Sequence, residues 1–172
     1  MPKISIVIPL FNEEENIQEL YQRLKNALEK DFKEFLQEII FVDDGSTDNS
    51  FSLLEKLHQK DNSVKVIQFS RNFGHHIAVS AGLDKANGDF VVMMDGDLQD
   101  QPEEIIKLYK KLNEGYDVVY VIREKRVTSL FRRICFSIFH YLNKLICEIP
   151  IEPCGIFGLM DKKVVEKIKI LT

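Results

Sequence analysis

The chain has 172 residues, 45% hydrophobic and 29% charged, which is enough for one globular domain with a proper core. Its net charge is −4, from 23 basic and 27 acidic residues, which argues against nucleic acid as a partner. The three cysteines show no CxxC spacing, so we expect neither a disulfide framework nor a zinc site, and a reducing compartment fits best. No segment approaches about 20 uninterrupted apolar residues, so a spanning helix is not expected.

Short apolar segments alternate with longer amphipathic segments along the chain. Five short apolar segments are predicted to be strands. Segments 4–10 and 39–42 are expected to be buried, and the others are 64–69, 90–94 and 118–122. Four segments with apolar residues at helical spacing are predicted to be helices: 14–30, 49–60, 76–86 and 103–113. This alternation predicts an α/β domain with a mostly parallel sheet and helices on both faces.

The character of the chain changes after Arg123. Residues 130–146 are apolar over a wide arc and also carry Arg132, Arg133 and Lys144. Such a segment can pack on the sheet as a helix, which we favour, or lie on an anionic membrane surface.

Polar residues and glycines follow every predicted strand. Ligands of open parallel sheets bind beyond the carboxyl ends of the strands. The segments at these ends are 9–13, 43–46, 70–74, 95–99 and Arg123. Each composition alone is ordinary for a turn, but all five ends together predict a ligand site.

The segment Asp95-Gly96-Asp97 is the sharpest of these, because two carboxylates one residue apart can bind one hard cation such as Mg²⁺ or Mn²⁺. An EF-hand is excluded, since Asp100 and Ile106 stand where its loop needs Gly and Glu. The sequence also lacks the glycine-rich phosphate motifs of Rossmann dinucleotide-binding domains and P-loop proteins.

Three further side chains are candidates for the nucleotide. Asp44 can accept hydrogen bonds from a base or a ribose, although a helix N-cap around residues 46–48 is an alternative use of this turn. The guanidinium groups of Arg71 and Arg123 suit diphosphate oxygens. The adjacent residues His75 and His76 do not share a helix face, so we interpret them as loop and helix-start residues, not as a metal pair.

Four segments, in this order and spacing, resemble glycosyltransferase family 2, the inverting transferases with a GT-A fold. They are VIPLFNEEENI (7–17), FVDDGSTDNS (41–50), FSRNFGHHIAVSAGLDKANGD (69–89) and MMDGDLQDQPEEI (93–105). The resemblance covers essentially the whole chain, and the sequence DGDLQDQP is most similar to that of the polyprenyl-phosphate sugar transferases. It implies a three-layer, Rossmann-like GT-A catalytic domain over residues 1–172.

The resemblance also implies roles for individual residues, among them the DxD motif at 95–97. Together with the polar sheet edge, it gives these nucleotide-sugar-binding residues: Pro9, Phe11, Asn12, Glu13, Val42, Asp44, Arg71, Asn72, Asp95, Gly96 and Arg123. The metal ligands would be Asp95, Asp97 and Gln99, and the catalytic residues Asp97 and Arg123.

The implied reaction moves a sugar from a UDP- or GDP-linked donor to a polyprenyl phosphate, with Mg²⁺ or Mn²⁺ as cofactor. The implied location is the cytoplasm, at the cytosolic face of a membrane that the full-length protein contacts. A homo-oligomer is compatible with the sequence. Members of this branch usually continue into juxtamembrane and membrane-spanning helices, which we expect to be absent from these 172 residues.

The later segment departs from the family pattern. Where relatives often carry G-D-F-R-L, this chain has Gly155-Ile156-Phe157-Gly158-Leu159, without the acidic and basic residues. A sugar hydroxyl needs a base during attack, whereas a phosphate monoester is already an oxyanion at neutral pH. A lipid phosphate acceptor is therefore favoured. The alternatives are a nucleotide-sugar-binding domain with impaired turnover, and a transferase acting on a saccharide hydroxyl in cell-wall or capsule synthesis.

Overall fold

The computed structural model describes residues 1–122 and 154–171 of the chain. The chain divides into two compact units, one formed by Met1–Tyr120 with Ile156–Thr172 and the other by Val121–Gly155. Arg123 and the segment 130–146, whose roles were predicted from the sequence, lie outside the described residues.

A six-stranded sheet forms the middle layer, with the strand order β3-β2-β1-β4-β6-β5. The strands are β1 (Lys3–Leu10), β2 (Leu36–Asp43), β3 (Val64–Gln68), β4 (Phe90–Met93), β5 (Val118–Ile122) and β6 (Cys154–Asp161). The pairs β1–β2, β2–β3 and β1–β4 are parallel, and β6 runs antiparallel to β4. The predicted mostly parallel sheet is thus confirmed.

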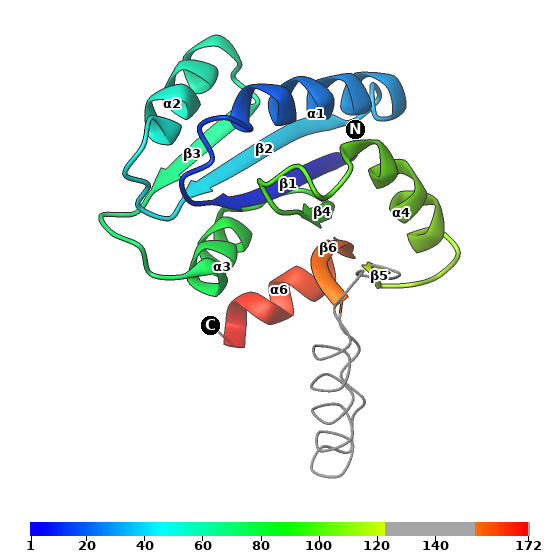
Figure 1. The fold of residues 1–172 in the computed structure, drawn as a ribbon. Coiled ribbons are helices and arrows are strands. Elements are labelled where there is room, and N and C mark those ends of the chain that lie inside the picture. Colours follow the sequence, from blue (N-terminus) through cyan, green and yellow to red (C-terminus); the bar gives the residue numbers. More distant parts are fainter. Residues whose placement is uncertain (123–153, 172) are drawn as a thin grey trace, which may run out of the picture. The chain divides into compact units, whose positions relative to one another are not determined.

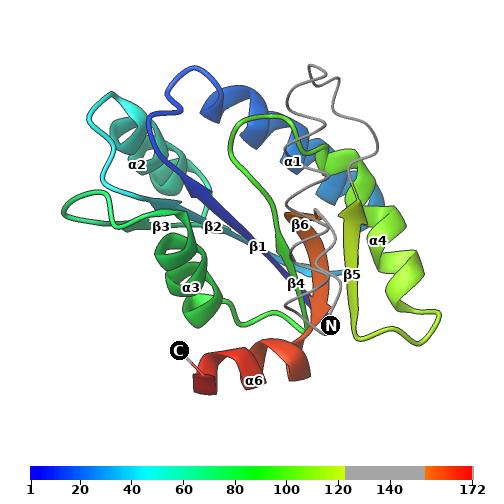
Figure 2. The ribbon, with the colours of Figure 1, turned by 60° about the horizontal axis from the view of Figure 1, so that its bottom comes forward.

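Helices cover both faces of this sheet. They are α1 (Ile17–Asp31), α2 (Ser50–Lys60), α3 (His75–Lys85), α4 (Ile105–Leu112), which follows a 3₁₀ turn η1 (Pro102–Glu104), and α6 (Lys162–Leu171). Helices α1 and α2 lie over one face and α3 and α6 over the other (Figure 1), and α4 lies beside α1 (Figure 2). The three-layer arrangement expected from the sequence is therefore present.

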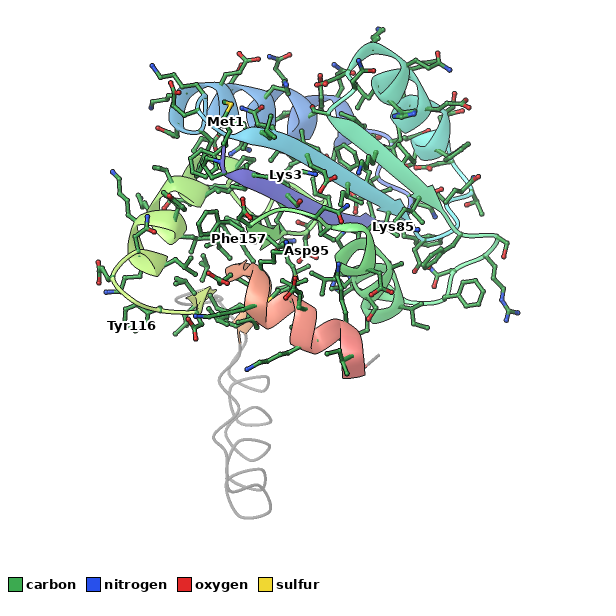
Figure 3. All side chains as sticks on the ribbon, turned by 180° about the vertical axis from the view of Figure 1, so that it is seen from behind. Met1, Lys3, Lys85, Asp95, Tyr116 and Phe157 are labelled. Atoms are coloured by element: carbon green, nitrogen blue, oxygen red, sulfur yellow. The ribbon has the colours of Figure 1, made fainter. Side chains whose placement is uncertain are left out.

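Burial explains why these segments fold as they do. In β1, Ile4, Ile6, Val7 and Ile8 are fully buried, because side chains on both faces of a central strand meet a helix layer (Figure 3). Helix α1 turns its apolar stripe, which includes Leu20 and Leu24, into the core at helical spacing.

The contact between α3 and the sheet depends on a glycine. Helix α3 packs on β1 and β2. A Cβ placed on Gly82 would collide with the side chain of Val7 and lie 3.1 Å from a methyl carbon of Val42. The missing side chain lets α3 approach the sheet closely, which fixes the position of the helix start.

An aromatic cluster attaches α4 to the opposite face. The rings of Phe32, Phe35, Phe90 and Tyr109 meet at centroid distances of 5.1 to 6.2 Å, mostly edge to face. Such pairs add about 0.5–1.5 kcal/mol each beyond their burial.

The strand β6 was not predicted. Its sequence contains two glycines, yet Phe157, Leu159 and Met160 are buried because the strand is inserted between β4 and β5. Among residues 1–122 and 154–171, we find no helix with the length and hydrophobicity needed to cross a membrane.

Candidate active site

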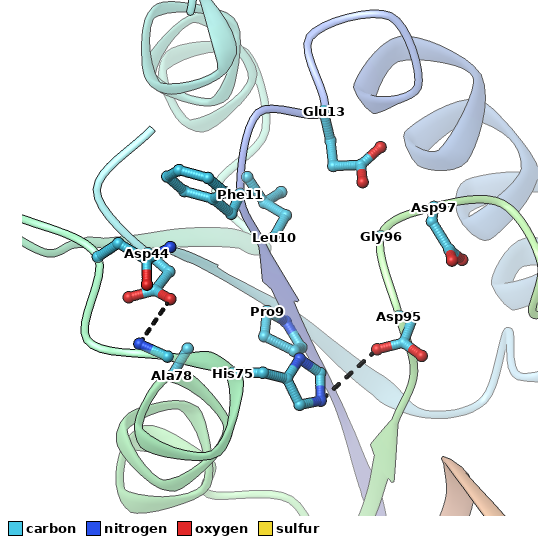
Figure 4. A pocket seen from close by; sticks show the side chains of 12 residues that line it. Pro9, Leu10, Phe11, Glu13, Asp44, His75, Ala78, Asp95, Gly96 and Asp97 are labelled. Carbon is cyan, nitrogen blue, oxygen red and sulfur yellow. Dashed lines mark hydrogen bonds and ion pairs between the residues drawn. The ribbon is translucent and has the colours of Figure 1, made fainter. Parts of the chain in front are cut away.

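A cavity of about 460 Å³ opens at the carboxyl edge of the sheet, where β1, β2 and β4 end (Figure 4). Its walls come from the segment after each of these strands and from the start of α3. The lining residues are Pro9, Leu10, Phe11, Glu13, Asp44, Asn72, Gly74, His75, Ala78, Asp95, Gly96 and Asp97. Segments that are far apart in sequence meet here because the strands are parallel and in register.

The loop after β4 presents two carboxylates to this cavity. The backbone N–H of Asp95 donates to Oδ2 of the buried Asp100 at 2.9 Å, and the N–H of Gln99 donates to Oδ1 of Asp97 at 3.0 Å. Leu98 has a φ of 62°, a left-handed conformation that tightens the turn. These constraints hold Asp95 and Asp97 at the cavity wall.

Gly96 allows this loop to lie against β1. A Cβ at this position would be 3.0 Å from Cβ of Leu10 and 3.4 Å from the carbonyl oxygen of Pro9. A larger residue would push the loop, and with it both carboxylates, away from the cavity.

His75 is a cavity residue that the sequence analysis missed. Its Nε2 lies 3.7 Å from Oδ1 of Asp95, and both side chains are partly exposed to the cavity (Figure 4). The structure begins α3 at His75, one residue before the predicted start, and this helix start lies at the carboxyl edge of the sheet. His75 could have been predicted from this position, because a residue that follows a strand and its loop at the carboxyl edge can reach a ligand bound there.

Asp44 anchors the loop that follows β3. Its two carboxylate oxygens accept hydrogen bonds from the backbone N–H groups of Phe73 and Gly74 at 2.8 and 2.9 Å, and the residue is 3% exposed. The turn-stabilising contact to Ser46 comes instead from Asp43, whose Oδ1 accepts the Ser46 N–H at 3.1 Å. Asp44 therefore lines the cavity and also shapes it.

The loop after β1 is tied to the loop after β2. Oδ1 of Asn12 accepts the backbone N–H of Thr47 at 2.8 Å, and the Asn12 N–H donates to Oγ of Ser46 at 2.9 Å. Asn12 has a φ of 55°, which asparagine tolerates. The neighbouring Glu13 accepts a hydrogen bond from Nδ2 of Asn16 at 2.5 Å while it lines the cavity. Asn12 thus joins the two loops by hydrogen bonds, whereas Glu13 lines the cavity.

A second cavity of about 650 Å³ adjoins the first, with Phe11 and Asn72 in both. Its other lining residues are Gly45, Ser46, Thr47, Gln68, Phe69, Ser70 and Arg71. The guanidinium carbon of Arg71 lies 4.9 Å from the ring centroid of Phe73. The structure thus places Arg71 in the second cavity, away from the two aspartates of the first.

Some of the expected residues are placed elsewhere. Val42 is fully buried in the core beneath α3, and Gln99 is exposed beside the cavity. Ile156 and Gly158 lie on β6. A Cβ on Gly158 would be 2.5 Å from Cδ1 of Tyr120, so this position has no room for the arginine of the G-D-F-R-L pattern.

The donor set of the first cavity fits a divalent cation. Among the residues that the structure describes, no three His, Cys, Asp or Glu side chains form a group that could hold a metal ion, so substrate and water would have to complete the coordination. Mg²⁺ and Mn²⁺ typically take one or two carboxylates and fill their remaining positions with water and substrate phosphates. Asp95 and Asp97 match this pattern.

The sheet order and the helix layers define an α/β domain of the GT-A type, a fold that its structural neighbours share. The model of the family "Glycosyl transferase family 2" matches residues 5–168. The chain belongs to this family.

The chain is similar to an uncharacterized glycosyltransferase, YkcC, of Bacillus subtilis (strain 168). The two are 44% identical over 170 residues, which is 97% of this chain and 52% of the relative. The chain spans about half the length of the curated relatives that it matches.

Two solved structures are also similar. Staphylococcus aureus TarS 1–349 in complex with UDP is 29% identical, with a TM-score of 0.54 over 74% of this chain and 38% of that chain. The mannosyltransferase PcManGT from Pyrobaculum calidifontis, in complex with GDP-Man and Mn²⁺, has a TM-score of 0.66 over 97% and 46% of the two chains. The latter is 19% identical, so it supports the fold alone.

Proposed function

We propose that this chain binds a UDP- or GDP-sugar and a divalent cation at the carboxyl edge of its sheet, and transfers the sugar to a polyprenyl phosphate with inversion. The observation that carries the proposal is the convergence of Asp95, Asp97 and Glu13 with the Asp44-anchored loop around one cavity. The complex of a similar protein, TarS 1–349, with UDP supports a nucleotide-linked donor.

Each group has a role that follows from its position. Asp95 and Asp97 would hold the cation, which as a Lewis acid offsets the charge that develops on the leaving diphosphate. The exposed ring of Phe11 lies between the two cavities and can stack on a base, and Arg71 can donate to phosphate or ribose oxygens from the second cavity. The second cavity would thereby hold the nucleoside, and the first cavity would hold the diphosphate, the sugar and the cation.

The acceptor is inferred from β6. Ile156 stands where relatives often carry an aspartate and has no group that takes a proton. A phosphate monoester, with a second pKa near ~6, attacks as an oxyanion and needs no such base. An acceptor phosphate oxygen would form the bond to the anomeric carbon on the face opposite the departing nucleoside diphosphate, which inverts that carbon.

Calorimetry with UDP- and GDP-sugars, with and without Mn²⁺, tests the donor half. We expect Mn²⁺-dependent binding of one of the two, and its loss in Asp97→Ala. Glu55→Ala, which removes an exposed carboxylate on α2, serves as the matched control and should bind normally. Equal affinity in Asp97→Ala and the control would refute the metal site.

Transfer of a radiolabelled sugar tests the acceptor half. Labelled product with undecaprenyl phosphate in detergent supports the proposal. Product with a saccharide acceptor alone would refute the lipid phosphate and indicate a hydroxyl acceptor. Donor binding without transfer to either acceptor would indicate a nucleotide-sugar-binding domain.

A further inference from the structure

We infer that His75 is a ligand of the divalent cation, alongside Asp95, and that it makes the site favour Mn²⁺ over Mg²⁺. The inference rests on the proposed function, since the cation is the one that the nucleotide sugar needs. It adds a nitrogen ligand to a set for which the sequence offered oxygen ligands alone.

The distance between the two side chains fits a shared ion. Nε2 of His75 and Oδ1 of Asp95 are 3.7 Å apart, longer than a hydrogen bond. Two ligands that each lie about 2.1 Å from one ion are about 3.0 Å apart at right angles and about 4.2 Å apart on opposite sides. An ion can therefore be placed between these two atoms with little movement of either residue.

His75 is held on a rigid support. It is the first residue of α3 and follows Gly74, whose φ of 100° turns the chain into the helix. The N–H of Gly74 donates to Asp44 at 2.9 Å, and α3 packs closely on the sheet through Gly82. The helix start, and with it the backbone of His75, is thereby fixed at the cavity wall.

Asp95 is held equally well from the other side. Its backbone N–H is bonded to Asp100, and its side chain is 27% exposed, against 42% for His75. Both groups face the cavity and are accessible to an ion from solvent. Ligands fixed by the surrounding structure lose little freedom on binding, which favours binding.

The two ligands leave room for substrate. With one imidazole and one or two carboxylates, the remaining positions are open to diphosphate oxygens and water, as in other substrate-bridged sites. An imidazole suits transition metals, whereas Mg²⁺ favours oxygen ligands. A site with His75 in the coordination shell should therefore discriminate between Mn²⁺ and Mg²⁺ more strongly than one with carboxylates alone.

The adjacent His76 supplies a matched control. It is exposed, and it is not among the described residues that line the cavity. A change at His76 alters the same helix start and removes the same chemical group, whose ring centroid lies 5.8 Å from that of His75, without removing a residue that lines the cavity. Effects shared by both variants report on the helix, and effects confined to His75 report on the site.

Pulsed electron paramagnetic resonance of bound Mn²⁺, with UDP or GDP present, detects a directly coordinated ¹⁴N. We expect its modulation in the wild type and in His76→Ala, and its loss in His75→Ala and His75→Gln. By calorimetry, His75→Ala should weaken Mn²⁺ binding about tenfold or more and Mg²⁺ binding less. Thermal unfolding of each variant checks that the fold is retained.

Two results would overturn the inference. One is a wild-type Mn²⁺ spectrum without ¹⁴N modulation, and the other is an equal loss of Mn²⁺ and Mg²⁺ affinity in His75→Ala. If the wild type binds nucleotide sugar with Mn²⁺ but shows no nitrogen ligand, the role of His75 fails and the proposed function stands. If the wild type binds no nucleotide sugar with either ion, the proposed function itself fails.

Discussion

Replacing Glu38 with Gln should lower the free energy of unfolding by about 3 kcal/mol at neutral pH, because its buried carboxylate joins four segments at the amino end of the sheet. Glu38 lies on β2 and is 2% exposed. It accepts hydrogen bonds from Nζ of Lys3 at 3.0 Å, Nζ of Lys65 at 2.5 Å, the N–H of Asn87 at 3.1 Å and the hydroxyl of Ser5.

The magnitude follows from the pKa of this carboxyl group. Burial by itself would raise the pKa of Glu38, but the hydrogen bonds from Lys65, Ser5, Asn87 and Lys3 outweigh burial and lower the pKa from 4.5 to about 2. A lowering of this size corresponds to about 3 kcal/mol. Since the pKa is lowered in the folded state, the stabilisation is fully present above about pH 4.5 and is lost as the pH falls toward 2.

Urea denaturation of the wild type and Glu38→Gln, at pH 7 and at pH 3, measures this difference. We expect a gap of about 3 kcal/mol at pH 7 and less than about half of it at pH 3. Glu34→Gln, at an exposed position near the start of the same strand, should stay within about 0.5 kcal/mol of the wild type. A gap that is the same at both pH values, or below 1 kcal/mol at pH 7, would refute the reasoning.

Three other substitutions probe the loops and the strand near the cavity. Asp44→Asn leaves one backbone N–H of the loop after β3 without its acceptor, so unfolding in urea should show a loss of about 1–3 kcal/mol, with weaker nucleotide binding by calorimetry. Asp100→Ala removes the acceptor of the Asp95 N–H and should weaken Mn²⁺-dependent nucleotide binding, measured by calorimetry, about tenfold. Asp100→Asn, whose amide oxygen can still accept this hydrogen bond, should keep most of the wild-type affinity. Gly158→Ala places a Cβ 2.5 Å from the ring of Tyr120 and should cost about 1–3 kcal/mol in urea unfolding, and a neutral result would show that β5 and β6 can separate.

The parallel core of the fold was predictable from local sequence. The segments 4–10, 90–94 and 118–122 match β1, β4 and β5 to within a residue. For β1 and β4 the reason is that strands buried on both faces have continuous apolar sequences, whereas β5 is apolar but only partly buried. Strand β6 was not predictable in this way. Its pairing with β4 joins Phe90 to Asp161, and nothing local in a segment with Gly155 and Gly158 indicates such a distant antiparallel partner.

The candidate site was predictable where it depends on the ends of strands. Glu13, Asp44 and Asp95 follow β1, β2 and β4, and all three line the cavity. His75 was not predicted as a site residue, because adjacent histidines do not share a helix face, which argues only against a His75–His76 metal pair. Its position at the edge of the sheet depends on where α3 begins. Asp100 was missed because its role depends on how its loop closes onto Asp95, which its spacing in the sequence does not reveal.

Carboxylates serve opposite purposes at the two ends of this sheet. At the amino end, Glu38 is closed off from solvent and fully supplied with donors, so its charge stabilises the fold. At the carboxyl end, Asp97 is partly exposed at the cavity wall, where a ligand can reach it. Asp97→Ala should therefore change the free energy of unfolding by less than about 1 kcal/mol while it removes metal-dependent binding, and Glu38→Gln should do the reverse. Urea unfolding and calorimetry on the same two variants test this separation, and an Asp97→Ala protein as destabilised as Glu38→Gln would show that the cavity loop also supports the core.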